Sequence, residues 1–538
     1  LKNICLGIAC IAVVSACNDK MDYHEYTSYD KDYVFSDFSR TAGFVNNIYS
    51  YLDSDLPSYQ SLASACDEAE MAVTYSSVLD YTNGAWSALN PKSLWGYYSG
   101  IRAANYFLEE SKDLDFYDLR YAQDYEAQMN RFNRYQYEVR LLRAYYYFLL
   151  VRAYGDVPFT VNVLTEKEAN SLSRTPASEV FDFIISECEE VAPELPVSYS
   201  ALDNDAAGGS NPEAGRVTQG TALALKARAA LYRASKLFSG GEDRNLWREA
   251  AVANKAVIDY CTANGIRLGK YTDIWGTDNY QASEMIFVRR IGDTSSPEYT
   301  NFPVGMENAS SGNCPTQTLV DAYESKDNGD KDPRFGMTIA CNGDKWPNTN
   351  PNPLETFIGG KNGLPLPYAT PTGYYLKKYM NETVSLTPSN EKKKPHHFII
   401  FRYAEILLNY AEAMDAWKGA DYTDNDHPLS ARAALNQVRS AADMPAVTTD
   451  GDAFTESIRR ERRVELAFED HRFWDIRRWK IGDKTKAIYC IKITLENGSP
   501  VYKKELLETR NWDDKMYLYP IPQTEYYKNP NLGQNTGW

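Results

Sequence analysis

The sequence predicts a mainly α-helical fold in which tetratricopeptide-like helix pairs stack into a superhelix, with a long loop-rich excursion and minor β strands. Two observations predict this fold. Apolar residues recur with a helical period in two blocks of the chain, and the segment between the blocks is rich in Gly, Pro, Asn and Thr. With 538 residues, 43% of them hydrophobic, the chain can also bury a large core.

Eight segments carry the helical period. They are residues 94–108, 125–154, 177–191, 219–237 and 247–261 in the first block, and 401–417, 429–441 and 454–478 in the second. Three pairs share a similar content of Ala, Tyr and Leu, namely 138–154 with 177–191, 221–237 with 247–261, and 402–417 with 429–441. Alanines in both helices of the second pair indicate a close approach. Such pairs resemble tetratricopeptide units, although the full consensus is absent, and repeats of this kind stack into a superhelix.

Residues 264–397, between the two blocks, form the excursion. They contain turn-rich stretches such as 343–348 and 350–353, and only short strand-like runs such as 285–288. Long loops inside compact domains are uncommon unless they are functional, because binding residues are disproportionately carried on loops. We therefore expect the ligand-binding residues to be concentrated in this segment.

The N-terminal residues have the layout of a secretory signal peptide. An apolar run at 4–16 follows Lys2 and ends in Ser15-Ala16, directly before Cys17. The run is shorter than the roughly 20 apolar residues that a membrane-spanning helix needs. Residues 14–17 are similar to a bacterial lipobox, which implies that Cys17 is acylated. We expect a signal peptide at 1–16 and a polar, flexible tether at 17–35.

The segment 459–480 combines eight basic and five acidic residues with many aromatic and aliphatic ones. Its glutamates at 461, 465 and 469 recur every four residues and would repel one another on one helix face. So many apolar neighbours do not suit a solvated surface, and buried charges need partners. We therefore expect a partly buried helix with a structural ionic network, paired as Arg462–Glu465, Glu469–Arg472 and Asp475–Arg478.

Three other motifs accompany this charged segment. They are FRYAEILLNYAEA at 401–413, RAYYYF at 143–148 with YGDVP at 154–158, and LYPIP at 518–522 with NPNLGQN at 529–535. Together with 459–480, these motifs resemble, in order, the signature elements of the SusD/RagB family of outer-membrane lipoproteins. The resemblance spans nearly the whole chain. It implies a SusD-like fold, with an N-terminal helical region at 36–263 and a C-terminal SusD/RagB region at 264–538.

The family resemblance also implies a function. It suggests a cell-surface lipoprotein, anchored in the outer membrane through lipid on Cys17, that captures oligosaccharide or polysaccharide and delivers it to a SusC-like TonB-dependent transporter. Capture of another nutrient, such as peptides, and a structural role as a surface scaffold are the alternatives. A glycan array would best separate them.

Composition and motifs argue against several other functions. A formal net charge of −16 disfavours binding to nucleic acid, which needs clustered Lys and Arg. No sequence pattern of a metalloprotease, serine hydrolase, nucleotide-binding loop or dinucleotide-binding fold is present. The five His residues lack metal-ligand spacing, and six scattered cysteines do not make a disulfide scaffold. We therefore predict no catalytic activity, no cofactor and no metal site.

A glycan site needs aromatic rings for the apolar faces of sugars. One stacked sugar that buries roughly 100 Å² contributes about 2.5 kcal/mol, whereas even a millimolar complex needs about 4 kcal/mol. At least two rings are therefore required. The candidates for the rings are Trp86, in a polar loop, and Tyr299 and Trp346, in the excursion. The weaker polar candidates are Asp67, Glu68, Arg290 and Asn301.

Overall fold

The computed structural model describes residues 30–199, 215–348, 350 and 352–538. Cys17, the signal peptide at 1–16 and the first part of the tether lie outside these residues. The rest of the proposed tether is folded, because Lys31–Phe35 form helix α2 and the Phe35 side chain is buried in the core. The expectation of a flexible segment up to residue 35 is wrong for these five residues.

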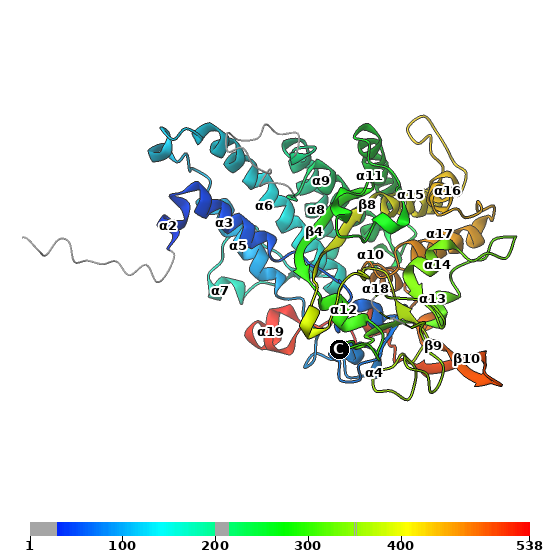
Figure 1. The fold of residues 1–538 in the computed structure, drawn as a ribbon. Helices are drawn as coiled ribbons and strands as arrows, with labels where there is room; N and C mark the ends of the chain where they lie inside the picture. Colours follow the sequence, from blue (N-terminus) through cyan, green and yellow to red (C-terminus); the bar gives the residue numbers. More distant parts are fainter. Residues whose placement is uncertain (1–29, 200–214, 349, 351) are drawn as a thin grey trace, which may run out of the picture.

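A row of long helices forms the body of the molecule (Figure 1). Each helix of the row packs on the next one along the chain: α5 on α6, α6 on α8, α8 on α9, α9 on α11, α11 on α15, and α15 on α16. The long helices are α3 (Phe38–Tyr49), α5 (Tyr97–Glu110), α6 (Tyr125–Tyr154), α8 (Ala177–Val191), α9 (Gln219–Ala234), α11 (Arg244–Ala263), α15 (Tyr403–Lys418), α16 (Ala431–Ala441) and α17 (Gly451–Glu465). All three predicted helix pairs are confirmed. The fold is mainly α-helical, as predicted.

The alanines of α9 and α11 allow the close contact that the sequence indicates. Ala227 and Ala250 are fully buried, and the Asn254 side-chain amide donates to the Ala227 carbonyl of the facing helix. A capping box at Thr218 starts α9. The helix ends where Ser235 adopts an extended conformation, so the predicted segment 219–237 is divided between α9 and the short helix α10 (Lys236–Ser239).

The predicted helix 454–478 is also two helices. Phe468 and Asp470 both have positive φ angles, a left-handed conformation that ends α17 before α18 (Arg472–Arg478) begins. The remaining short helices are α4 (Asp80–Asn83), α7 (Glu166–Ala169), α12 (Ser296–Asn301), α13 (Gln317–Val320), α14 (Pro333–Thr338) and α19 (Gln523–Lys528).

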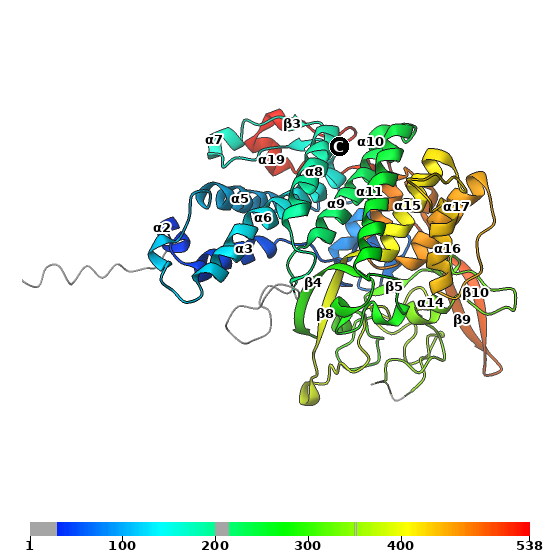
Figure 2. The ribbon, with the colours of Figure 1, turned by 90° about the horizontal axis from the view of Figure 1, so that it is seen from above.

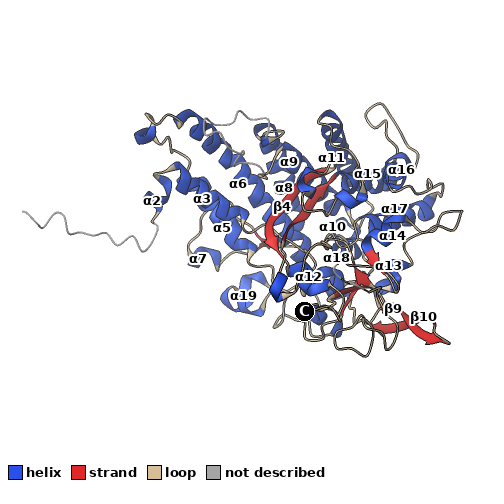
Figure 3. Cartoon of the chain, viewed as in Figure 1, coloured by secondary structure: helices blue, strands red, loops and turns tan. Residues whose placement is uncertain are grey.

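The strands form small antiparallel pairs, as Figure 3 shows. The predicted run 285–288 is part of β4 (Met285–Thr294), which pairs with β8 (Lys394–Arg402). The hairpin of β9 (Ala487–Glu496) and β10 (Ser499–Thr509) was not expected. The other pairs are β1 (Ala69–Met71) with β5 (Asn313–Pro315), β2 (Val157–Pro158) with β3 (Arg174–Thr175), and β6 (Ile339–Ala340) with β7 (Tyr375–Leu376).

The excursion lies on one side of the helical row (Figure 2). It has its own hydrophobic cluster, which includes Phe302, Trp346 and Tyr375, and this cluster also contacts Phe468 at the break between α17 and α18. The excursion is therefore a packed part of the fold, although it is rich in loops. Within the described residues, no helix has both the length and the apolar character needed to cross a membrane, and the six cysteines there are free thiols.

Candidate functional site

The charged segment is a buried ionic network, but most of its partners lie far away in the sequence. Arg402 donates to Glu465 and Glu469, both at 2.7 Å, and Arg334 donates to Glu465 at 2.7 Å. Lys378 pairs with Glu469 at 2.6 Å. Burial raises the pKa of Glu465, but the guanidinium groups of Arg402 and Arg334 outweigh it and lower that pKa to about 2. The network joins the excursion and β8 to α17.

Only one of the three predicted local pairs is confirmed. Arg478 donates to Asp475 at 2.8 Å. Arg462 pairs with Asp475 rather than Glu465, at 2.6 Å. Arg472 pairs with Asp67 rather than Glu469, at 2.8 Å. The other two predicted pairs are wrong. Arg462 and Glu465 lie on the same helix, but Glu465 accepts from Arg334 and Arg402 instead. Glu469 and Arg472 lie on either side of Asp470, whose left-handed backbone is part of the break between the helices.

Two of the polar candidates belong to this network and are inaccessible to a ligand. Asp67 and Glu68 are 2% and 3% exposed. Asp67 binds both Arg463 and Arg472. Burial raises the pKa of Glu68 to about 8 even though the neighbouring guanidinium groups oppose it. These carboxylates connect the segment before β1 to the turn between α17 and α18, so their role in this structure is to position β1.

Trp86 and Trp346 do not offer a ring face to solvent, so the expectation that these loop tryptophans are exposed is wrong. Trp86 is 4% exposed because Tyr519 and Trp538, from the end of the chain, pack edge-on against its ring, both at 4.9 Å. Trp346 is 2% exposed and packs against Phe302. Each ring is held by residues distant in sequence or by the excursion's own hydrophobic cluster.

Tyr299 is exposed, and it belongs to a group of four tyrosines, which we call the tyrosine cluster: Tyr59, Tyr75, Tyr299 and Tyr368. Tyr75, Tyr299 and Tyr368 are 71%, 48% and 41% exposed. The rings of Tyr75 and Tyr368 meet edge to face at 6.0 Å. Partial burial raises the pKa of Tyr59, and a hydrogen bond with the Ser310 side chain lowers it. The phenols of Tyr299, Tyr75 and Tyr368 are close enough to raise this pKa further. Four rings from four segments thus share one surface.

Buried asparagines hold the segments of the tyrosine cluster together. The Asn301 side chain, at the end of α12, donates to the Pro57 carbonyl at 2.9 Å and accepts from the Asn313 backbone N–H at 3.0 Å. Asn313, in β5, donates to the Ser58 carbonyl at 2.9 Å. The candidate Asn301 is therefore buried and positions the cluster instead of facing a ligand.

The turn after β1 places Tyr75. The pairing of β1 with β5 continues in a hydrogen bond from the Ala72 N–H to the Gly312 carbonyl at 2.8 Å. The Ser76 hydroxyl then donates to the Tyr59 carbonyl, which joins the two ring-bearing turns. The excursion also contains a cavity of about 260 Å³, whose polar lining includes Glu307, Lys361 and Asn362 and which none of the four tyrosines lines.

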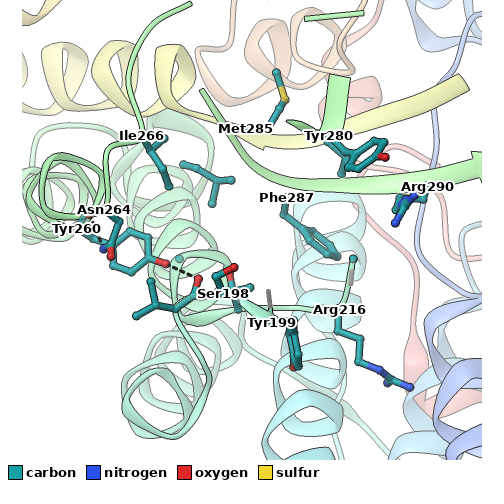
Figure 4. Close-up of a pocket in the computed structure, with 16 residues that line it drawn as sticks. Ser198, Tyr199, Arg216, Tyr260, Asn264, Ile266, Tyr280, Met285, Phe287 and Arg290 are labelled. Carbon is teal, nitrogen blue, oxygen red and sulfur yellow. Dashed lines mark hydrogen bonds between the residues drawn. The ribbon is translucent and has the colours of Figure 1, made fainter. Parts of the chain in front are cut away.

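Arg290, the last candidate, lines a different cavity of about 360 Å³ beside β4. Figure 4 shows Arg290 and Tyr280 at one end of this cavity, with Tyr260 and Asn264 at the other. The Arg290 guanidinium lies 4.1 Å from the centre of the Tyr280 ring. The residues that line this cavity include none of the tyrosine cluster.

Three of the four clustered tyrosines were missed from the sequence. Tyr59, Tyr75 and Tyr368 are among 41 tyrosines, and nothing in their neighbours marks them as exposed. One sequence feature could have indicated them. Each of these three tyrosines follows or precedes a Ser, Pro or Ala and lies in a turn-rich stretch, not in a segment with an apolar helical period. Among the described residues, no group of three or more His, Cys, Asp or Glu side chains is arranged to hold a metal ion.

Two family models match the chain. A model described as the SusD family matches residues 231–538, and a model described as starch-binding associating with outer membrane matches residues 24–205. SusD-like protein P2 of Formosa agariphila is 26% identical over 439 residues, which cover 76% of this chain and 74% of that protein.

Solved structures share the fold over nearly the whole chain. A SusD-like protein of Bacteroides fragilis aligns with a TM-score of 0.77 and 25% identity, over 95% of this chain and 99% of that one. A SusD-like carbohydrate binding protein of the same species aligns with a TM-score of 0.74 and 24% identity, over 93% and 99%.

Proposed function

The chain belongs to the SusD family, and from this membership and the tyrosine cluster we propose that it is a lipid-anchored protein of the outer-membrane surface that binds glycans. We further propose that it delivers the captured oligosaccharide or polysaccharide to a SusC-like TonB-dependent transporter. Its action in this proposal is binding, without catalysis. The name of the second B. fragilis relative, a carbohydrate binding protein, supports the class of ligand.

The observation that carries the proposal is the exposure of several tyrosine rings on one surface. Exposed aromatic rings in a group are uncommon on a soluble surface without a binding role. One sugar face stacked on a ring contributes about 2.5 kcal/mol. Two such contacts therefore exceed the roughly 4 kcal/mol of a millimolar complex. The cluster offers Tyr75, Tyr299 and Tyr368 for this purpose.

The polar groups of the cluster suit hydroxyl-rich ligands. The phenol hydroxyls both donate and accept hydrogen bonds, and the Gln60 amide lies beside Ser77 at 2.8 Å in the same turns. A rigid base matters as well, because a pre-organised site loses less entropy on binding. The asparagine clamp of Asn301 and Asn313 supplies that base.

The test is calorimetry on Tyr75→Ala and Tyr299→Ala with the glycan that a glycan array identifies for the wild-type protein. Each variant should weaken binding roughly tenfold to a hundredfold, which corresponds to about 1–3 kcal/mol. Their melting temperatures should change little because the side chains are exposed. Tyr121→Ala is the matched control, because Tyr121 is an 84% exposed tyrosine in the turn before α6, outside the cluster.

Two results would contradict the proposal. Wild-type affinity in both cluster variants would place the glycan elsewhere. Binding of peptides, but of no glycan on the array, would favour capture of a different nutrient.

A further inference from the structure

A second large cavity lies on the other side of the helical row from the excursion. Its volume is about 670 Å³, which is within the range of roughly 300–1,000 Å³ typical of small-molecule sites. It is bounded by α10, α11, α15, α17 and the end of α18. Figure 2 shows α10 on the side of the row opposite the loops of the excursion. The cavity shares no residue with the tyrosine cluster.

Three tryptophans line this cavity, and two of them are fixed by hydrogen bonds. The Trp247 indole N–H donates to the Gly241 carbonyl at 2.8 Å, and the Trp479 indole N–H donates to Glu412 at 2.7 Å. Both rings are nearly buried, whereas Trp417 is half-buried. Trp247 and Trp479 are therefore fixed in the base of the cavity, and the half-buried Trp417 is the ring that can meet the apolar face of a ring-shaped ligand.

Polar groups in the same cavity are only partly satisfied. Asp415 is half-buried, and its Oδ2 accepts from the Thr455 hydroxyl at 2.7 Å. Its Oδ1 has no hydrogen-bond partner among the described residues. Arg459 lies 5.0 Å from the centre of the Trp479 ring, and its one ion-pair partner among the described residues is the exposed Glu456. A carboxylate oxygen and a guanidinium are thus available beside the indoles.

The charges around the cavity balance. Four cationic and four anionic side chains line it, so it does not select for a strongly charged ligand. Several of these groups, at the exposed rim, form no ion pair with any described residue: Lys236, Glu242, Arg244, Lys418 and Asp452. Donors and acceptors therefore both line a cavity that also contains three indole rings. A neutral ligand with an apolar ring face and many hydroxyl groups satisfies both features.

We propose that this tryptophan-lined cavity is a second saccharide-binding site, in which Trp417 stacks on a sugar ring while Asp415 and Arg459 bind its hydroxyl groups. The proposal shares its class of ligand with the proposed function but has its own residues. The two sites lie on opposite sides of the row, so they bind short oligosaccharides independently. A long polysaccharide would gain affinity from both sites only where it can reach both.

The experiment compares three proteins on one glycan array that contains neutral oligosaccharides: wild type, Tyr75→Ala/Tyr299→Ala, and Trp417→Ala. We expect at least one oligosaccharide that still binds the double tyrosine variant. Its affinity for Trp417→Ala should be at least tenfold weaker than its affinity for the wild-type protein. Calorimetry with that oligosaccharide should then show the lost affinity in Trp417→Ala and not in Tyr121→Ala.

A second variant guards against misfolding, because Trp417 also packs on Tyr422 and His427. Asp415→Asn keeps an oxygen for the Thr455 hydroxyl and removes the charge. This variant should bind the same oligosaccharide more weakly than wild type does, and its melting temperature should stay within a few degrees of the wild-type value. Unchanged affinity in Asp415→Asn would overturn the proposal.

The outcomes for the two sites are distinguishable. If the double tyrosine variant loses all glycan binding, the tyrosine cluster is the binding site and the tryptophan-lined cavity is not. If binding depends on Trp417 alone, the cavity is the site and the proposed role of the cluster fails. If the wild-type protein binds no glycan, both proposals fail.

Discussion

Glu465 shows how a buried charge can serve the fold rather than a ligand. It is 5% exposed and accepts hydrogen bonds from both Arg334 and Arg402. Removing one member of a buried ion pair leaves its partners uncompensated and costs about 3–5 kcal/mol. We therefore expect Glu465→Ala to lower the free energy of unfolding by that amount in denaturant titrations.

Glu456→Ala is the matched control for Glu465, because Glu456 lies on the same helix but is exposed and forms an exposed pair with Arg459. Exposed pairs contribute about 0–1 kcal/mol, so this control should unfold almost as wild type. Equal stability of the two variants would show that the network does not stabilise the fold. A stable Glu465→Ala that had lost glycan binding would instead assign Glu465 to a binding site.

The Glu68 carboxyl predicts a dependence of stability on pH. Burial raises the pKa of the Glu68 carboxyl to about 8 in the folded protein, from an ordinary value of 4.5. Between these values the folded state binds more protons than the unfolded state, so this residue's contribution to stability falls as pH rises from about 4.5 to about 8. We expect Glu68→Gln to become more stable relative to wild type as pH rises from 5 to 8.

The measurement for Glu68 is the free energy of unfolding of both proteins at several pH values. The difference should grow by about 3–5 kcal/mol across that range. The exposed Glu496→Gln is the control for the change from a carboxylate to an amide. A constant difference for Glu68→Gln would mean that Glu68 is ionised in the folded protein.

At the scale of elements, the sequence predicted helices well and ion partners poorly. The helices α6 and α8 begin and end at the predicted residues. The break after α17 depends on Phe468 and Asp470 in left-handed conformations, which no local pattern marks. The partners of Glu465 and Glu469 come from β8 and the excursion, and such contacts follow only from the tertiary fold.

The exposure of the candidate site residues also depends on the tertiary fold. Trp86 was expected to be exposed because its neighbours are polar, but Tyr519 and Trp538 cover it from more than 400 residues away in the chain. Tyr299 was the one predicted ring that the structure leaves exposed. The sequence therefore identified the excursion as a place to look, but it could not assemble the four tyrosines, which come from separate turns.

The asparagine clamp predicts that a buried residue of α12 controls binding at the surface. Asn301→Ala removes the hydrogen bonds to Pro57 and Asn313 and so frees the segment that carries Tyr59 from α12 and β5. Each buried polar group left without a partner costs about 1–3 kcal/mol. We expect a lower melting temperature and at least a tenfold weaker affinity for the array-identified glycan.

A comparison with Asn279 separates positioning from general destabilisation. Asn279 is also a buried asparagine, with side-chain hydrogen bonds to two carbonyls, Ile274 and His397, away from the tyrosine cluster. Asn279→Ala should lower the melting temperature similarly but keep the affinity of the folded protein. If both variants lose affinity equally, Asn301 has no special role in placing the cluster.

At the scale of the whole molecule, the helical row and the buried ionic network hold different parts of the fold together. The row packs its neighbours in chain order, while the buried charges of α17 and α18 tie the row to the excursion and to the segment before β1. The loops that carry the tyrosine cluster therefore rest on a base with few degrees of freedom. In the proposed function, such a base would keep a glycan site made of separate turns pre-organised for binding.

The proposed lipid anchor would determine where the whole molecule works, and it supplies the last prediction. Cys17 lies in the part of the chain outside the described residues, so the lipobox-like sequence at 14–17 carries the argument. One acyl chain anchors a protein only marginally and two or more anchor it durably, because each buried methylene contributes about 0.8 kcal/mol. Cys17→Ala should therefore move the full-length protein, expressed with its signal peptide in a Gram-negative host, from the membrane to the soluble fraction. Cys10→Ala, within the same apolar run, should leave it at the membrane. Membrane retention of Cys17→Ala would show that the protein is held there by something other than lipid on this cysteine.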